Sequence, residues 1–276
     1  MTNRGRHGRA LLVTGAAIVG LTALAALVGP WLTPFDPSVQ ELPLRLAGPT
    51  LAHPFGLDEL GRDILARVLA GARISFAVGL AVVSVSASVG TVLGAIAGYF
   101  GGVIDDLISR VIDILLAFPG LLLAIALVAV LGASMTNVIL ALAIVYMPRV
   151  ARVVRASTLV VRELLFIEAA RALGVSTWRI LFIHILNNIA SPILVQATFI
   201  FAYAVLAEAG LSFLGVGVPP ELPTWGTMIA SGQQFAHQAI WLVVFPGVAI
   251  ILAALSLQMV GDGLRDLLAP ILRKTL

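Results

Sequence analysis

The chain has 276 residues but no cysteine, one lysine, four histidines and only 11% charged residues. The absence of cysteine excludes a disulfide scaffold. An average soluble domain is about 25% charged, so too few charges are present here to cover a globule in water. Hydrophobic residues make up 60% of the sequence, and the mean hydropathy is +1.06. These values exclude disorder and a soluble enzyme with one anchor helix, and they predict an all-α, polytopic membrane protein.

Long apolar stretches with few or no charged residues predict about six membrane-spanning helices, because a bilayer core needs about 20 apolar residues per helix. These stretches are residues 10–32, 74–104, about 107–131, about 137–157, 180–207 and 239–261. A signal peptide is the alternative for the first stretch, but its apolar run is longer than the usual ~7–15 residues and no convincing cleavage site follows. We therefore divide the chain into residues 1–32 (tail and first helix), 33–72 (outer loop) and 73–276 (five-helix core).

The basic residues are distributed unevenly between the two predicted sides of the membrane. One side receives 13 of the 17 basic residues: Arg4, Arg6, Arg9, Arg110, Arg149, Arg152, Arg155, Arg162, Arg171, Arg179, Arg265, Arg273 and Lys274. The positive-inside rule predicts that this side is the cytoplasm, with both termini on it. Trp31, Trp225 and Trp241 fall near the outer boundaries, where tryptophan anchors helices at the interface.

The outer loop carries the charged segment HPFGLDELGRDILARVLAG, starting at His53. We expect Asp58 to cap a short interfacial helix that pairs Asp63 with Arg67 and ends at Gly71. The spacing of the histidine and the carboxylates matches no known pattern of metal ligands, so no metal site is expected.

The longest inner loop runs from about Arg149 to Asn188 and contains a distinct segment at about 158–188. Residues 160–173 are predicted to form a helix that ends at Gly174, and Ser176 is expected to cap a second short helix. An amphipathic hairpin lying on anionic lipid is one interpretation. Small residues gain little from lipid but let a partner's backbone approach, so Ala169, Ala170 and Ala172 favour protein docking.

Glycine and proline mark two further features of the predicted helices. Gly90, Gly94 and Gly98 recur at four-residue spacing, which favours close helix packing either within this chain or against a partner. Pro119 and Pro246 each lie in a Phe-Pro-Gly sequence, where proline frees a carbonyl and weakens the helix. They are expected to be hinges, although proline is also generally more frequent in membrane helices.

The sequence offers little for chemistry on a substrate. A phosphate-binding loop ends in Gly-Lys-Ser/Thr, whereas the single lysine here is Lys274, near the C-terminus. We therefore expect neither ATP hydrolysis by this chain nor any enzyme activity. A secondary transporter or channel would place ionisable groups at the membrane midplane. Asp113 and Glu208 are the candidates, but both lie toward helix ends and are expected to form hydrogen bonds facing a partner.

Several segments resemble the permeases of bacterial ABC importers. Glu168-Ala169-Ala170 with Gly174 resembles the EAA loop of that family. The sequences HPFGLDELGRD, GYFGG, DILLAFPGLLLAIAL, AEAGLSFLGVG and GDGLRDLLAP resemble the dipeptide/oligopeptide/nickel branch and, within it, the C-type subunit. One departure is Asn187, where the family commonly has proline; asparagine imposes no kink, which leaves the angle of the fifth span open.

The resemblance implies a type I importer permease fold in a bacterial inner membrane. It implies that this chain forms half of a pathway for peptides or similar solutes. The implied partners are a second permease, two ATPase subunits or one fused ATPase, and a solute-binding protein. ATP and Mg would be bound by the ATPase, and this chain would hold no cofactor. The implied coupling residues are Glu168, Ala169, Ala170, Arg171, Gly174, Trp178 and Arg179; no substrate-binding residue is assigned.

Overall fold

The computed structural model describes residues 3–275, without the side chains of residues 3–5, 30, 32 and 269–275. Its longer helices are α1 (Asn3–Leu32), α2 (Ile64–Phe100), α3 (Gly102–Ala117), α4 (Gly120–Leu131), α5 (Met135–Val161), α8 (Leu186–Phe213) and α10 (Trp241–Thr275). Shorter helical elements are η1 (Leu42–Leu44), α6 (Leu165–Ala172), α7 (Thr177–Arg179), η2 (Ile180–Ile185), α9 (Trp225–Gly232) and η3 (Gln233–Phe235). No strand occurs in this range, which confirms the all-α prediction. The side chains of Arg4, Arg273 and Lys274 lie outside the described set.

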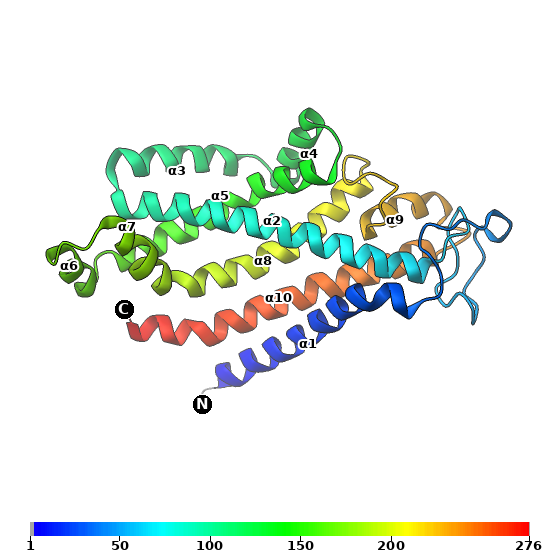
Figure 1. Ribbon diagram of the computed structural model, residues 1–276, viewed down its shortest axis with the longest axis horizontal. Helices are drawn as coiled ribbons and strands as arrows, with labels where there is room; N and C mark the ends of the chain where they lie inside the picture. The colour runs from blue at the N-terminus through cyan, green and yellow to red at the C-terminus, as the bar shows by residue number, and fades with distance from the viewer. Residues whose placement is uncertain (1–2, 276) are drawn as a thin grey trace.

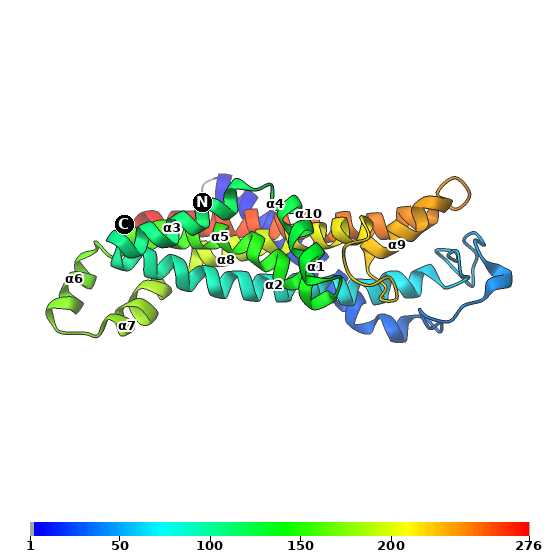
Figure 2. The same cartoon turned by 90° about the horizontal axis from the view of Figure 1, so that it is seen from above.

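The molecule is an elongated bundle whose long helices run along one axis (Figure 1). The loop of residues 33–63 and α9 lie at one end, here named the loop end, and α6 and α7 project from the other, the α6 end (Figures 1 and 2). Five helices are long and apolar enough to cross a membrane, and the pair α3 and α4 counts as a sixth if it forms one span. The prediction of about six spans is therefore confirmed for the described residues.

The predicted third span is not a straight helix. Its two halves, α3 and α4, meet at an angle of 94°. Pro119 lacks the N–H that would continue the helix, and its ring disfavours helical backbone in the residue before it. Phe118 is accordingly extended, with φ −89° and ψ 140°. A hydropathy window detects the apolar length but not this elbow.

The short interfacial helix expected after Asp58 does not exist as a separate element. Residues 64–71 are the first turns of α2, which continues to Phe100. Asp63 caps this helix by accepting a 2.7 Å hydrogen bond from the N–H of Ala66. Gly71 does not end the helix; it is buried where a Cβ atom would lie 3.2 Å from Trp225 Cδ1 and 3.3 Å from the carbonyl oxygen of Pro223. The glycine therefore serves packing rather than termination.

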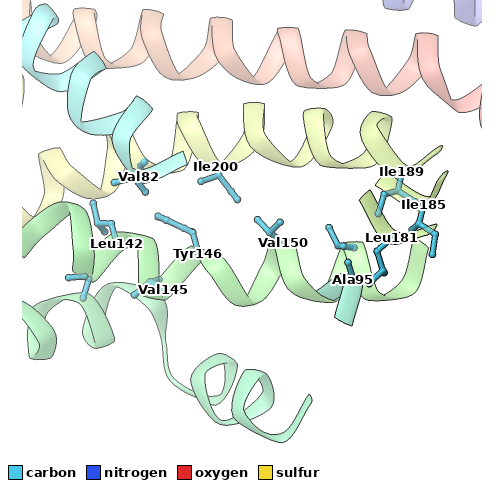
Figure 3. Close-up of a cluster of buried hydrophobic side chains, with 14 of the residues drawn as sticks. Val82, Ala95, Leu142, Val145, Tyr146, Val150, Leu181, Ile185, Ile189 and Ile200 are labelled. Carbon is cyan, nitrogen blue, oxygen red and sulfur yellow. The ribbon is translucent and has the colours of Figure 1, made fainter. Parts of the chain in front are cut away.

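The main core lies between α2, α5 and α8 (Figure 3). It is filled by aliphatic side chains with almost no exposed surface, among them Val82, Leu142, Val150, Ile189 and Ile200. Since lipid is as apolar as these side chains, close packing rather than exclusion from water must hold the three helices together.

The glycine row of α2 faces α5 within this chain. A Cβ atom on Gly90 would lie 2.8 Å from the carbonyl oxygen of Met147, one on Gly94 2.4 Å from that of Ala151, and one on Gly98 2.8 Å from that of Arg155. Side chains at these positions would push the helices apart. The row therefore decides how closely α2 approaches α5, and it is not a surface for a partner.

A second close contact joins the two ends of the chain. A Cβ atom on Gly15 would lie 2.7 Å from the carbonyl oxygen of Ser256, and one on Gly263 2.6 Å from the nitrogen of Leu12. A Cβ atom on Gly8 would lie 2.6 Å from Asp266 Cβ. Helices α1 and α10 therefore pack antiparallel, and this brings both termini to the α6 end of the bundle (Figure 1).

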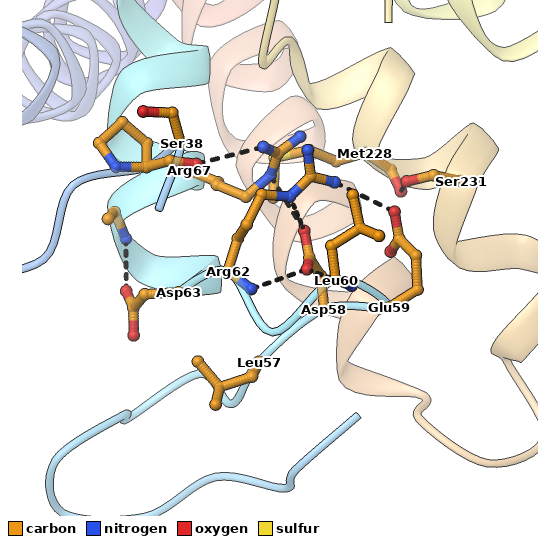
Figure 4. A network of polar contacts seen from close by, with 12 residues as sticks. Ser38, Leu57, Asp58, Glu59, Leu60, Arg62, Asp63, Arg67, Met228 and Ser231 are labelled. Carbon is orange, nitrogen blue, oxygen red and sulfur yellow. Dashed lines mark hydrogen bonds and ion pairs between the residues drawn. The ribbon is translucent and has the colours of Figure 1, made fainter. Parts of the chain in front are cut away.

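The charged outer loop is folded around two arginines (Figure 4). Asp58 accepts a 2.6 Å hydrogen bond from Arg62 Nε and lies 3.4 Å from Arg67 Nε. Arg67 is only 3% exposed and also donates to the carbonyl oxygen of Pro37. Asp63 contacts His53 at 2.9 Å instead of Arg67, so the predicted pairing was wrong. Asp63 caps α2, and Asp58 in the preceding turn therefore forms the ion pairs with Arg62 and Arg67.

Two tryptophans expected at the lipid interface hold protein segments together instead. Trp225 is 2% exposed and donates a 3.0 Å hydrogen bond to the carbonyl oxygen of Val68. Trp241 donates at 3.2 Å to the carbonyl oxygen of Leu57. Only Trp31, which is 81% exposed, lies on the surface as expected. The indole N–H of Trp225 fixes α9 to the start of α2, and that of Trp241 fixes α10 to the loop before α2.

Candidate functional site

The segment of residues 162–185 forms a hairpin at the α6 end. Its first helix, α6, ends in a Schellman motif: the N–H of Val175 bonds to the carbonyl oxygen of Ala170, and that of Gly174 to Arg171. Gly174 has φ +74°, as its predicted position requires. The helix is shorter than expected, because α5 extends to Val161 and α6 begins only at Leu165. Ser176 precedes α7, but its side chain makes no capping hydrogen bond.

The residues predicted for coupling do not all face outward. Glu168, Ala169, Arg171, Gly174, Trp178 and Arg179 are exposed. Ala170 is only 8% exposed and belongs to the core cluster that contains Ile180 and Ile185. Its small side chain thus permits close approach of this chain's own residues, whereas Ala169 and Ala172 are open to a partner.

Large apolar side chains on this hairpin are also uncovered, and of these only Trp178 was among the predicted coupling residues. Leu165 is 81% exposed and Leu173 83%. Trp178 and Phe182 stack with ring centroids 6.0 Å apart and are 60% and 52% exposed. An apolar patch of this kind, with Glu168 and two arginines among it, marks a surface that binds another molecule.

The hairpin is fastened to the membrane helices by groups that were also missed. Arg162 Nη1 donates to the carbonyl oxygens of Gly98 at 2.7 Å and Tyr99 at 3.3 Å, both at the end of α2. The guanidinium of Arg171 lies 5.0 Å from the centre of the Tyr99 ring. Ile167 is fully buried beneath α6. A displacement of the hairpin would therefore move the end of α2 directly.

The second half of the hairpin continues into α8 without a break. Residues 177–213 form one helical stretch in which residues 180–185 have π-helical geometry. The expected separate second helix is therefore part of the fifth span. Asn187 lies near the start of α8 and produces no kink, and Asn188 donates at 2.7 Å to the carbonyl oxygen of His184. Since asparagine retains its backbone N–H, the helix can pass through this position.

Three arginines predicted for the inner loop lie inside α5 instead. They are Arg149, Arg152 and Arg155, spaced by three residues on the face toward α3 and α8. Arg152 Nη2 donates to Asp113 at 2.7 Å, and Arg155 Nη2 to Asp105 at 2.6 Å. The charge pattern indicates an inner loop from Arg149 onward, but α5 continues to Val161. It can do so because α3 provides the carboxylates that pair with Arg152 and Arg155.

Glu208 does not face a partner, contrary to expectation. Its side chain is fully buried within this chain, where Ser212 Oγ donates at 2.8 Å and Ser75 Oγ at 3.3 Å. Ser212 Oγ in turn accepts from the N–H of Val218. The carboxyl group therefore joins α2, α8 and the loop before α9 near the loop end.

The fold and the exposed hairpin define a multi-pass helical permease with a docking surface at one end of its bundle. This chain belongs to the family of binding-protein-dependent transport system inner membrane components, whose model matches residues 90–274. The predicted resemblance to ABC importer permeases is thereby confirmed, and the alternative of a secondary transporter or channel is not supported.

The chain is similar over nearly its full length to permease proteins of several transport systems. It is 46% identical to the dipeptide transport system permease protein of Alkalihalophilus pseudofirmus, over 94% of this chain and 86% of the relative. It is 42% identical to the di/tripeptide transport system permease protein of Pseudomonas aeruginosa (94% and 88%). It is 47% identical to the glutathione transport system permease protein of Salmonella typhimurium (97% and 88%).

Proposed function

We propose that this chain forms half of the translocation pathway of an ATP-driven importer for peptides. The relatives named above are permease proteins for dipeptides, di- and tripeptides and glutathione, all of which carry peptide bonds and free carboxylates. The remaining half would come from a homologous permease. A solute-binding protein would deliver the peptide at the loop end, and two ATPase subunits or one fused ATPase would bind at the α6 end.

The single observation that carries the coupling proposal is the exposed apolar face of the hairpin at residues 162–185. Figure 2 shows α6 projecting past the ends of the long helices, which favours protein docking over a position flat on lipid. Ties from Arg162 and Arg171 to the end of α2 would transmit the movement of an ATPase to the bundle. Glu168, Ala169, Trp178 and Arg179 would contact the ATPase, while Ala170 would support α6 from beneath.

Orientation and energy source follow from the same assignment. The hairpin and both termini lie at one end of the bundle, and most basic residues cluster toward it, so this end would be cytoplasmic. ATP and Mg would be bound by the ATPase subunits, and this chain would carry no cofactor and perform no catalysis.

The proposal is tested with the complete transporter in proteoliposomes. Uptake of a labelled dipeptide should require ATP on the hairpin side and the binding protein on the other side. A proton gradient without ATP should produce no uptake. Uptake driven by the proton gradient alone would refute the proposal, as would ATP-driven uptake that is independent of the binding protein.

Replacing Pro119 tests whether the elbow between α3 and α4 moves during transport. Pro119→Ala restores a backbone N–H, and one added helical hydrogen bond of about 1 kcal/mol favours a straight conformation about fivefold. We expect peptide uptake per ATP hydrolysed to fall by about that factor. Pro246→Ala should have a smaller effect, because α10 is already one continuous helix through Pro246. Normal coupling in Pro119→Ala would show that the elbow is static.

A further inference from the structure

The third arginine of the α5 row, Arg149, differs from the other two. Arg152 and Arg155 form ion pairs with Asp113 and Asp105 on α3. Arg149 forms no salt bridge within the described part of the chain, and its guanidinium lies 5.6 Å from the centres of both the Tyr146 and the Tyr203 rings. Helix α3 ends at Ala117, and beyond Pro119 the next helix, α4, turns away from the axis of α3 at 94°. No acidic residue of α3 is therefore paired with Arg149.

Arg149 also lies near the middle of α5, away from both helix ends. It is 14 residues from Met135 and 12 from Val161, or about 21 and 18 Å along α5 at 1.5 Å per residue. An arginine inside a membrane helix is costly against lipid and normally faces a water-filled cavity or a counterion. The side chain is nevertheless exposed on this subunit. This combination favours a position of Arg149 on the surface that lines the pathway.

A pocket of about 250 Å³ opens beside the guanidinium. It is lined by Gly120, Leu121, Leu142, Val145, Tyr146, Arg149, Tyr203 and Ala207. Tyr146 is held in place because its hydroxyl donates at 3.2 Å to the carbonyl oxygen of Tyr203. The central carbon of the guanidinium lies over both rings, and the group carries five N–H bonds that can donate. The pocket thus presents one cation between two tyrosines, in a wall completed by aliphatic side chains.

We propose that Arg149, held by Tyr146 and Tyr203, binds a carboxylate of the transported peptide inside the pathway. A guanidinium pairs with a carboxylate through two parallel hydrogen bonds, and this interaction is strengthened where water is scarce. The carboxylate can be the C-terminal group or an acidic side chain of the peptide. The site lies at the elbow between α3 and α4, because Gly120 and Leu121 line it. A bound peptide would therefore contact the part of the bundle that bends. This assignment rests on the proposed function of peptide import.

The charge in the pocket can be tested without transport. The chain contains no cysteine, so Leu121→Cys, at a 45% exposed position in the pocket wall, introduces a single thiol. In the assembled transporter, the rates of reaction with an anionic and a cationic methanethiosulfonate reagent are compared with and without Arg149→Gln. A unit charge at this range should change the anion-to-cation rate ratio about fivefold. Arg149→Lys should preserve the ratio.

Ala133→Cys, in the exposed loop after α4, provides the matched control. Along α5 it lies more than 20 Å from Arg149, about twice the Debye length at physiological salt, so its ratio should not respond to Arg149→Gln. An unchanged ratio at Leu121→Cys would overturn the proposal, because it would mean that a partner's carboxylate neutralises Arg149. Absence of reaction at Leu121→Cys would also overturn it, because the pocket would then be closed to solutes.

Transport assays then identify the ligand. Uptake is measured for a dipeptide, for its C-terminal amide and for an amidated peptide with an acidic side chain, each at a concentration that saturates the binding protein. Loss of a charged hydrogen-bonded pair should lower uptake of the free acid relative to the amide about tenfold in Arg149→Gln. A parallel loss for the acidic side-chain peptide would extend the site to any carboxylate. An equal reduction for all three peptides would overturn the inference, whereas absence of ATP-driven uptake in the wild type would refute only the proposed function.

Discussion

Replacement of Gly94 by leucine is expected to prevent this chain from accumulating as a folded membrane protein. A Cβ atom at this position would lie 2.4 Å from the carbonyl oxygen of Ala151, 2.8 Å from Val154 Cβ and 3.0 Å from the backbone nitrogen of Arg155. Two of these three atoms belong to backbone, so no side-chain rotation relieves the contact. Overpacking commonly costs about 1–3 kcal/mol, and more where backbone must move.

Helix α5 cannot move away to accommodate the leucine. Gly90 and Gly98 fix it one turn on either side, and the core side chains of α2, α5 and α8 interlock behind it (Figure 3). We therefore expect the abundance of the Gly94→Leu protein in the membrane to fall to background. Quantitative immunoblotting of membranes and the unfolding temperature of any purified protein measure this effect.

Gly20→Leu is the matched control, because a Cβ atom on Gly20 in α1 would meet nothing within 4 Å. Insertion of the same apolar side chain should leave abundance unchanged there. Gly94→Ala should lie between the two, since it adds only the clashing Cβ atom. Wild-type abundance and unfolding temperature in Gly94→Leu would show that α2 and α5 are not packed as described.

The second large effect is expected from Gly174→Val. Gly174 has φ +74°, a conformation that costs residues other than glycine about 1–2 kcal/mol and is least favourable for β-branched side chains. A Cβ atom there would meet nothing within 4 Å, so the penalty is confined to the backbone. The Schellman motif should open and change the angle between α6 and α7, while the bundle stays folded.

The expected consequence is loss of coupling rather than loss of the permease. Because each 1.4 kcal/mol corresponds to a factor of ten, co-purification of the ATPase and ATP-driven peptide uptake should fall about tenfold or more. Membrane abundance should stay at the wild-type level. The measurement is the ratio of ATPase to permease after affinity purification, together with uptake in proteoliposomes.

Two variants separate coupling from general strain. Gly174→Asn should retain most activity, because asparagine tolerates positive φ. Gly215→Val introduces the same strain at the loop end, where φ is +76° and a Cβ atom also meets nothing within 4 Å. It should leave ATPase binding intact. If Gly174→Val transports normally, the hairpin is not the coupling element.

Local features of the sequence predicted where the first helix of the hairpin at residues 162–185 ends. Gly174 was assigned from its neighbours alone, because a glycine after a helical run satisfies the last carbonyls through positive φ. The spans were equally local, since each membrane helix satisfies its own backbone and so depends on apolar length. The 94° elbow at Pro119 was not assigned as an elbow, because proline permits a bend without fixing its angle.

Residues that act through distant partners could not be assigned correctly. Trp225 reads as an interfacial anchor, yet it bonds to Val68, which lies 157 positions away. Glu208 reads as a surface carboxyl, yet its partner Ser75 is 133 positions away. Periodicity reports that a side chain lies on a given helix face, but the identity of the facing helix depends on how all the helices pack.

The sequence by itself determined that this protein is an all-α membrane permease with a glycine-capped hairpin between two of its helices. The permease assignment came from the resemblance to a known family, whereas the helices and the hairpin arise from hydropathy, local hydrogen bonding and backbone conformation, which act over a few residues. The tertiary structure decided that the row containing Gly94 packs on α5. It also decided that, among the described residues, Arg152 and Arg155 have carboxylate partners whereas Arg149 has none and lies beside an open pocket. Those distinctions depend on contacts between residues tens of positions apart, which form only when the helices assemble.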